Sequence, residues 1–364
     1  MKIISRIGEK YFSPQEALGD RVNNFNIIRI IAAAMVIYGH MSSIMGVYKH
    51  TVYDQAVSTL AVKILFVISG YLIMGSLMND SHYGRYMIRR SFRIFPGLIG
   101  VVLFAIFVIG PLSTSLTLGE YFSSVTTWQY LRNIVLYPIY VLPGVFADYV
   151  YPNAVNGSLW TLPIEFALYL ILPALLYVFK KMDIVEHGLG IVTGICIVSD
   201  CVYTQWFPDA RLVVYGTNWF DALAIIPYFF MGSFIALPKI KKLLNIQIAT
   251  LLMVLLAIFK VSAAKYELAL CLILPYFVLS VALTERPVFS RWFEKCDFSY
   301  GLYLYGFVIQ QAVSHQLQKI GNFSLNQEFL ISFTITFVCA VFSWYIIEKP
   351  MQTIGKNLIK HMKT

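Results

Sequence analysis

The chain has 364 residues, of which 58% are hydrophobic and 13% charged, and its mean hydropathy is +0.69. That composition excludes an ordinary soluble domain and indicates a protein that crosses a lipid bilayer several times. The formal net charge of +9 is compatible with a nucleic-acid partner. Because the positive residues gather in short segments between apolar runs, we interpret the charge as a topology signal and expect no nucleic acid.

Ten apolar runs are long enough to be membrane spans, so we expect an all-α, polytopic membrane protein with about ten transmembrane helices. In chain order they occupy residues 26–48, 57–78, 94–112, 156–179, 187–204, 215–237, 246–262, 266–284, 298–316 and 327–347. On this division 1–25 is an N-terminal segment, 26–350 is the membrane domain and 351–364 is a basic tail.

Lysine and arginine residues are unevenly shared between the two sides of this topology. Most of the 28 lie on the side of the N-terminus, including those in 79–93, 238–242, 285–297 and the tail. Because cytoplasmic loops are enriched in Lys and Arg, we expect both termini in the cytoplasm.

Ionisable side chains inside the expected spans cost free energy, and we single out five of them as functional candidates. They are Arg29, His40, Lys63, Glu165 and Asp221. Arg29 and His40 share one helical face and lie roughly 16 Å apart along the axis, so both can line one narrow site. The alternatives are a snorkelling Arg29 and a buried structural His40.

Small residues and arginines mark the second span and the segment after it. Ser69 and Gly70, in ILFVISGYLIMG, predict close helix packing. Arg90 and Arg93, in RRSFRIFP, lie one helical turn apart, so both guanidinium groups can grip one phosphate. A positive anchor at the cytoplasmic face explains their charge equally well.

A long external segment, about residues 113–155, is rich in aromatic residues. These side chains fit either an interfacial belt or a surface that stacks on sugars, and the sequence leaves both open.

Glu165 follows this segment, near the outer end of an inward-running span, so its depth allows it to meet His40. A carboxylate beside an imidazole favours a base that takes a proton from a hydroxyl. Pro163 and Pro173 flank Glu165 and are expected to bend this helix.

The cysteines give no sign of a metal site. None of the five forms a CxxC pair or a Cys/His cluster, so we expect neither a metal nor a disulfide framework.

Six motifs together resemble the acyltransferase-3 family of integral-membrane O-acyltransferases. In order they are Arg29 followed by His40 after ten residues, FVISGYLI, RSFRIFP, LPGVF with VNGSLWTLPIE, FSYGLYLYGF, and IIEKP, and they span residues 29–350. The resemblance implies a multi-pass protein of the bacterial inner membrane, of the type without an attached hydrolase-like domain. It would move an acyl group, usually acetyl, from cytoplasmic acyl-coenzyme A to a hydroxyl of a surface glycan, such as O-antigen or exopolysaccharide, or of its lipid-linked precursor.

The resemblance also implies roles for single residues. The expected catalytic residues are His40 and Glu165; the expected donor-binding residues are Arg29, Ser69, Arg90 and Arg93; and the acceptor or pocket residues are Ser158, Trp160, Thr161 and Tyr303. Acetyl-coenzyme A is the expected donor substrate, with no permanently bound cofactor, and membrane lipid is a further partner. Gly306 stands where many members have a histidine, and Lys63 matches no family position.

A transporter of a sugar, lipid-linked saccharide or acyl donor is the main alternative. Buried charges and bent helices suit both classes. Transport has no specific need for the His40–Glu165 pair with three arginines at the opposite depth, so the sequence favours the enzyme.

Overall fold

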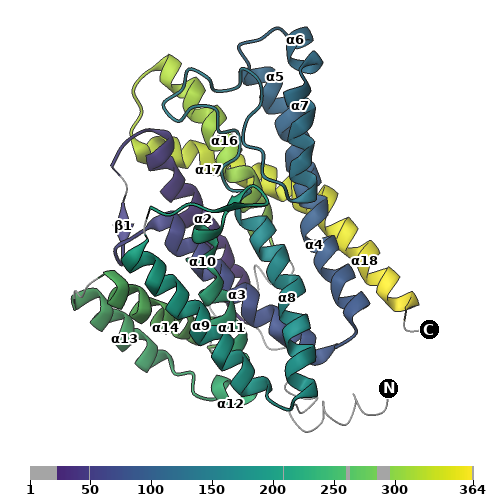
Figure 1. Cartoon of the computed structure of the whole chain (residues 1–364). Helices are drawn as coiled ribbons and strands as arrows, with labels where there is room; N and C mark the ends of the chain where they lie inside the picture. Colours follow the sequence, from purple (N-terminus) through teal and green to yellow (C-terminus); the bar gives the residue numbers. More distant parts are fainter. Residues whose placement is uncertain (1–22, 49, 208, 260–262, 285–295, 363–364) are drawn as a thin grey trace.

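The computed structural model describes residues 23–48, 50–207, 209–259, 263–284 and 296–362 (Figure 1). Most of the expected N-terminal segment and of the basic loop at 285–297 lies outside the described residues. The long helices are α2 (Phe25–Ile44), α3 (Val57–Asn79), α4 (Tyr83–Phe104), α8 (Thr161–Lys181), α9 (Val185–Trp206), α11 (Ile226–Ile235), α13 (Ile246–Ile258), α14 (Ala263–Ala282), α16 (Ser299–Ile320), α17 (Leu325–Ser343) and α18 (Lys349–His361).

Shorter elements connect these helices. They are α5 (Gly110–Ser113), α6 (Leu118–Ser123), α7 (Val125–Gln129), a 3₁₀-helix at Tyr130–Val135, α10 (Trp219–Leu223), α12 (Pro238–Lys241) and π-helical turns at Ala105–Ile109 and Trp344–Glu348. Two antiparallel hairpins pair β1 (Thr51–Val52) with β2 (Gln55–Ala56) and β3 (Val213–Val214) with β4 (Thr217–Asn218). The external segment predicted at 113–155 therefore contains short helices.

Seven helical stretches in the described part of the chain are long and apolar enough to cross a membrane. They are Phe25–Ile44, Val57–Asn79, Tyr83–Ser113, Thr161–Lys181, Val185–Trp206, Lys265–Ala282 and Leu325–His361. Shorter apolar helices cover Trp219–Ile235 and Ile246–Ile258, and α16 covers the expected ninth span. The expected all-α, multi-pass architecture is confirmed, while the count of about ten spans and the cytoplasmic termini stay predictions.

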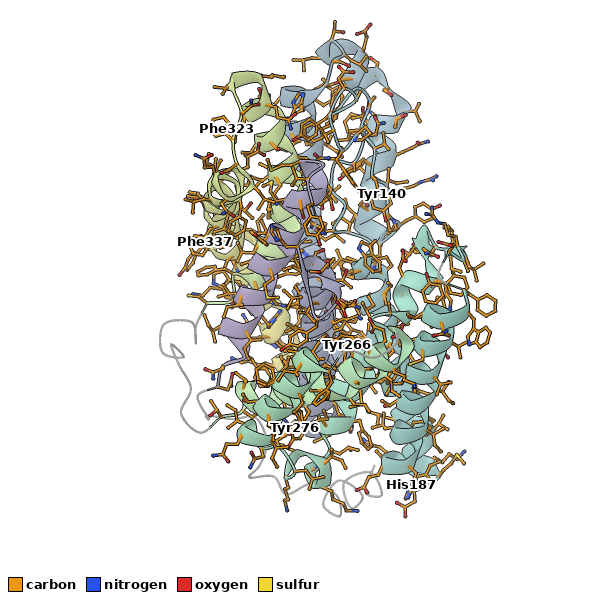
Figure 2. The ribbon with its side chains drawn as sticks, turned by 90° about the vertical axis from the view of Figure 1, so that its left-hand side faces the viewer. Tyr140, His187, Tyr266, Tyr276, Phe323 and Phe337 are labelled. Carbon is orange, nitrogen blue, oxygen red and sulfur yellow. The ribbon has the colours of Figure 1, made fainter. Side chains whose placement is uncertain are left out.

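The connections alternate between the two ends of the bundle. In Figure 1 the α3–α4 turn and α12 lie at the lower end, whereas α6 and α7 lie at the upper end. The side view in Figure 2 places Phe323, between α16 and α17, toward the end opposite His187, at the start of α9. The α3–α4 turn, the start of α9 and α12 therefore share one end, which we call the basic end, and the opposite end is called the outer end.

Helix α9 has an exposed apolar stripe on the outside of the bundle. Ile191, Ile195, Val198 and Val202 follow one another every three or four residues and are 62%, 60%, 61% and 43% exposed. A continuous apolar stripe of this kind is unfavourable in water and suits a lipid environment.

Helix α4 begins earlier than the sequence predicted. Residues 79–93 were expected as a loop, but the helix starts at Tyr83, where His82 caps it by accepting a hydrogen bond from the Arg85 backbone N–H. Asp80 forms ion pairs with Arg85 and Arg89 of the first turns. Local capping and charge pairing thus extend the helix beyond its apolar part.

Pro163 does not have the predicted effect on α8. It is the third residue of the helix, where a backbone N–H has no intrahelical partner to lose. The expectation that it bends the helix is therefore wrong, and only Pro173 lies in the helix interior.

Lys63 has a partner that the sequence did not reveal. Its Nζ lies 2.9 Å from Oε2 of Glu267 in α14 and 3.1 Å from Oε1 of Gln55, and the Lys63 and Glu267 side chains are 1% and 8% exposed. A buried charge needs such a counter-charge. The pair joins α3 to α14 and explains the otherwise unmatched lysine.

The crossing of α3 and α11 depends on glycine. A Cβ added to Gly70 would lie 1.9 Å from the backbone oxygen of Phe229, and one added to Gly232 would lie 2.1 Å from that of Val67. Ser233 donates a hydrogen bond to the Gly70 carbonyl at 3.1 Å. Close packing through small residues at Gly70 is therefore confirmed.

Gly70→Ala should separate these two helices and lower the thermal stability of the purified protein, because overpacking costs about 1–3 kcal/mol. Gly194, in α9, is the matched control, since no atom lies within 4 Å of its added Cβ. Gly194→Ala should keep or raise the midpoint of thermal unfolding, because alanine favours helix over glycine by about 1 kcal/mol. Equal midpoints for both variants would refute the tight crossing.

Candidate active site

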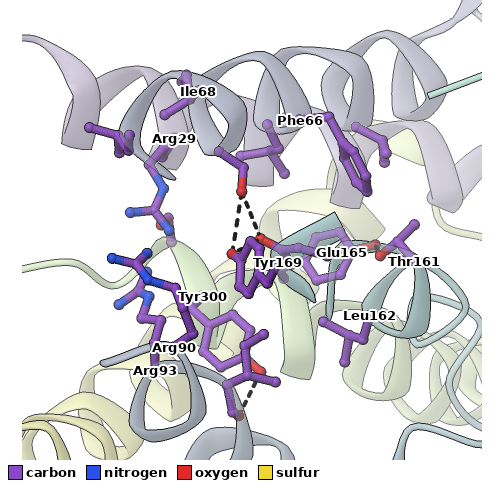
Figure 3. A pocket seen from close by; sticks show the side chains of 17 residues that line it. Arg29, Phe66, Ile68, Arg90, Arg93, Thr161, Leu162, Glu165, Tyr169 and Tyr300 are labelled. Carbon is purple, nitrogen blue, oxygen red and sulfur yellow. Dashed lines mark hydrogen bonds between the residues drawn. The ribbon is translucent and has the colours of Figure 1, made fainter. Parts of the chain in front are cut away.

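A cavity of about 100 Å³ lies between α2, α3, α4, α8 and α16 (Figure 3). Seven of the predicted site residues line it: Arg29, Ser69, Arg90, Arg93, Thr161, Glu165 and Tyr303. These residues come from helices far apart in the sequence. In Figure 3 the three arginines gather at one end, Thr161 lies at the other, and Glu165 and Tyr169 lie between them.

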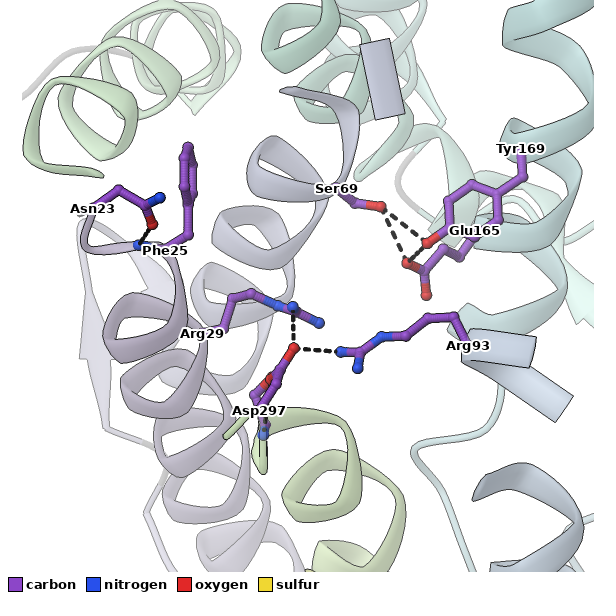
Figure 4. Close-up of polar contacts among 9 residues, drawn as sticks. Asn23, Phe25, Arg29, Ser69, Arg93, Glu165, Tyr169 and Asp297 are labelled. Atoms are coloured by element: carbon purple, nitrogen blue, oxygen red, sulfur yellow. Dashed lines mark hydrogen bonds and ion pairs between the residues drawn. The ribbon is translucent and has the colours of Figure 1, made fainter. Parts of the chain in front are cut away.

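At the arginine end, two guanidinium groups share one carboxylate (Figure 4). Oδ2 of Asp297 lies 2.5 Å from Nη1 of Arg29 and 2.7 Å from Nη2 of Arg93. The other carboxylate oxygen accepts hydrogen bonds from the Ser299 hydroxyl and backbone N–H. Within the described residues, Asp297 is the one carboxylate in direct contact with these two guanidinium groups.

Asp297 is a site residue that the sequence reasoning missed. Its side chain is 13% exposed; burial alone would raise its pKa, but Arg29 and Arg93 hold that pKa below its ordinary value. The available signal was an acidic residue directly before the FSYG motif, at the same expected depth as the arginines.

Arg90 has different surroundings. Its guanidinium carbon lies 5.8 Å from the ring centre of Tyr86 and 5.9 Å from that of Tyr169, a cation–π arrangement. Within the described ranges it forms no ion pair. The Tyr86 hydroxyl donates to the Tyr169 carbonyl at 3.0 Å and thereby fixes α4 against α8. Arg90 therefore adds a positive charge that rests on two aromatic rings.

Glu348, in the IIEKP motif, was given no role from the sequence. It is 1% exposed, accepts a hydrogen bond from Ser343 at 2.9 Å and interacts electrostatically with Arg93. It lies in the π-helical turn that precedes α18. The IIEKP motif therefore brings a buried carboxylate to Arg93 although it does not line the cavity itself.

The Glu165 carboxylate is held in the middle of the cavity. The Ser69 hydroxyl donates to its Oε1 at 3.1 Å, and the Tyr169 hydroxyl donates to the same oxygen. The two hydroxyl groups are 3.3 Å apart. Ser69, which was predicted to bind the acyl donor, thus orients Glu165 and also lines the cavity.

The NGSLWT segment closes the far end by docking on α16. The Asn156 amide donates to the Leu304 carbonyl at 2.8 Å, and the Tyr303 hydroxyl donates to the Ser158 carbonyl at 2.9 Å. The Thr161 and Tyr303 hydroxyls are 2.5 Å apart. Gly157 permits the contact, since a Cβ there would lie 2.8 Å from the Phe307 ring.

Three predicted residues are not among those lining this cavity. His40 packs edge-on against Phe307, with the two ring centres 5.2 Å apart. Phe307 lies on α16, one helical turn after Tyr303. Ser158 is 1% exposed, and Trp160 packs half-buried against the apolar core. The catalytic roles of His40 and Glu165 stay predictions.

Gly306 has a packing reason. A Cβ at this position would lie 2.8 Å from Cγ1 of Ile37, on α2, one turn before His40. Gln310, one turn further along α16, donates to the Ile37 carbonyl at 2.7 Å. The histidine expected here from the family resemblance would therefore require Ile37 or one of the two helices to shift.

Comparison with known proteins supports this architecture. The profile of a family described as an acyltransferase domain matches residues 22–349. The chain is 24% identical to an O-acetyl transferase of Shigella phage Sf6, over 91% of this chain and 96% of that protein. It is 27% identical to nodulation protein 10 of Rhizobium leguminosarum bv. viciae, over 95% of this chain and 97% of that protein. A peptidoglycan O-acetyltransferase of Listeria monocytogenes is 28% identical over 81% of this chain and 51% of its own length. No solved structure matches the chain.

Asp297→Asn should lower stability at pH 7 by about 3–5 kcal/mol, because it leaves two largely buried arginines without their shared carboxylate. A carboxylate whose pKa is lowered on folding stabilises the protein above its unfolded pKa of about 3.9, and that contribution is lost as the pH falls through the folded pKa. The difference between the two proteins in thermal unfolding should therefore shrink below about pH 4.

Glu186→Gln is the control for this variant, since Glu186 pairs with Lys239 at the surface, where the lysine is 75% exposed. Its cost should stay below about 1 kcal/mol. A loss for Asp297→Asn that is no larger than this, or that is independent of pH, would show that the shared carboxylate does not stabilise the site.

Proposed function

We propose that the protein moves acetyl from acetyl-coenzyme A to a hydroxyl of a cell-surface glycan. The premise is that the chain belongs to the acyltransferase-3 family and is an O-acyltransferase. The donor would enter from the basic end, which would face the cytoplasm of a bacterial cell, and the acceptor would come from the outer end. Relatives named O-acetyl transferase and peptidoglycan O-acetyltransferase support the acetyl group and the glycan.

The observation that carries the donor assignment is the gathering of three arginines at one end of the cavity. Arg29 and Arg93 share one carboxylate, and Arg90 has none, so this end attracts an anion. Guanidinium groups suit the phosphates of coenzyme A. Arg29 and Arg93 are 21% and 17% exposed, which leaves them reachable from the basic end.

The small volume of the cavity suggests that only part of this donor would enter it. About 100 Å³ is well below the roughly 300–1,000 Å³ of pockets that engulf whole ligands. The nucleotide would stay at the arginines, and the narrow pantetheine arm would carry the thioester past Glu165 toward Thr161. The acetyl group would thereby cross much of the membrane while still bound to its carrier.

His40 would serve as the base at the far end. It would take the proton of the acceptor hydroxyl as the oxygen attacks the thioester carbonyl; the carbon–sulfur bond would then break, and the proton would pass to the coenzyme A thiolate. Glu165 would stabilise positive charge that develops on the imidazole.

An assay with purified protein, radiolabelled acetyl-coenzyme A and glycan from cells lacking the protein tests this proposal. We expect label on the glycan and release of one coenzyme A for each acetyl transferred. Movement of acetyl-coenzyme A or of the glycan across a membrane, without release of coenzyme A, would instead identify a transporter.

Arg90→Ala should weaken binding of acetyl-coenzyme A by roughly tenfold to a hundredfold, because a charge-assisted contact is worth about 1.5–3 kcal/mol. Arg90 is the cleanest arginine to remove, since its loss frees no carboxylate. Arg85→Ala is the control on the same helix, because Arg85 pairs with Asp80 outside the cavity. Equal dissociation constants for both variants, measured by calorimetry, would make Arg90 a topology anchor only.

His40→Ala should lower the rate of transfer by at least about a hundredfold, the usual minimum for removing a general base. His40→Gln keeps a hydrogen-bonding group of similar size and should be equally inactive, whereas His187→Ala, on the exposed start of α9, should transfer normally. Near-normal glycan acetylation by His40→Gln at matched protein levels would reject the catalytic role.

A further inference from the structure

A second cavity, of about 440 Å³, opens at the outer end of the bundle. Its walls are the end of α5 with the following residues, the loop at 144–149 and the last turns of α16. Its polar lining comes from Asp148, Tyr149, His315, Gln318 and Lys319, together with the hydroxyl groups of residues 113–115. The volume lies within the range of small-molecule sites.

The walls of this cavity are fixed by hydrogen bonds. The Thr114 hydroxyl donates to the Pro143 carbonyl at 2.8 Å, and the Ser115 N–H donates to the Gly144 carbonyl at 2.9 Å. Gly144 has φ +69°, a conformation that favours glycine. The loop therefore holds its shape against α5 rather than merely lying over it.

A buried chain of hydroxyl groups anchors the opposite wall. The Tyr149 hydroxyl donates to Ser314, and the Ser314 hydroxyl donates to Glu328 of α17, which is 1% exposed. The rings of Phe146 and Tyr149 each lie 5.6 Å from that of His315 and enclose it edge-on. Two aromatic residues of the external segment, Phe146 and Tyr149, thus form part of the wall of this cavity.

A row of residues that winds gradually around α16 leads from one cavity to the other. Tyr303 lines the inner cavity, Phe307 contacts His40, Gln311 follows, and His315 lines the outer cavity, each one helical turn after the last. Tyr303 and His315 are therefore about 18 Å apart along the axis. The Gln311 amide fastens the external segment to this row by donating to the carbonyls of Tyr151 and Ala154, both at 2.8 Å.

We propose that the outer cavity binds one uncharged sugar unit of the acceptor glycan and directs the chain toward His40. This inference rests on the proposed function. Carboxylate, amide and hydroxyl groups match the alternating donors and acceptors of a sugar, and Asp148 and Lys319 offset each other's charge. Asp148, Gln318 and Lys319 are exposed, so the site is open to a polymer that arrives from outside.

The test compares two glutamines of the same helix. Gln318 lines the cavity, whereas Gln316, two residues earlier, is exposed and does not line it. With glycan from cells lacking the protein as acceptor, Gln318→Ala and Asp148→Asn should each raise the KM for glycan at least tenfold, with the KM for acetyl-coenzyme A as in the wild type. Gln316→Ala should match the wild type in both constants.

The outcomes separate this inference from the proposed function. If the wild type acetylates the glycan and the cavity variants keep its KM for glycan, the acceptor site lies elsewhere and the inference is overturned, while the proposed function stands. A rise in the KM for acetyl-coenzyme A as large as that for glycan would also overturn it, because a general distortion would then explain both. If the wild type transfers no acetyl to the glycan, the proposed function fails and the inference fails with it.

Discussion

The site depends on one carboxylate shared by two arginines inside the membrane domain. Arg29 from α2 and Arg93 from α4 meet at Asp297, directly before α16, and three elements distant in sequence are thereby tied at one point. Arginines at this depth are costly unless they are paired. The contact that stabilises the helices thereby also gathers the arginines that we propose bind the anionic donor.

The sequence predicted much of the cavity lining but not the ion pairs that join the helices. Arg29, Arg90, Arg93 and Glu165 could be recognised because a charge in or beside an apolar run is conspicuous. Asp297 also lies beside such a run, but its role could not be recognised because only the fold brings it to Arg29. The same reason hides Glu267, the partner of Lys63 from another span. Partner choice depends on which helices are neighbours, and a single sequence does not show this.

The fold, like the site, has features that the sequence predicts and features that only distant contacts decide. Hydrophobic runs predicted where the helices lie, because helix formation in lipid follows from local composition. The π-helical turn at Ala105–Ile109 was not predictable, since it is fixed by Tyr121, whose hydroxyl donates to the Ile106 carbonyl at 3.0 Å. Gly306 was conspicuous as a departure from the family pattern, but its cause, the close approach of Ile37, lies in α2. Long-range contacts therefore decide what local patterns leave open.

The central claim is that acetyl passes from a donor at the basic end to an acceptor at the outer end. Sealed proteoliposomes test it whatever the orientation of the protein. With radiolabelled acetyl-coenzyme A outside and glycan enclosed, we expect label on the glycan; with both outside, we expect none until detergent opens the vesicles. Acetylation of glycan on the same side as acetyl-coenzyme A in sealed vesicles would contradict the account.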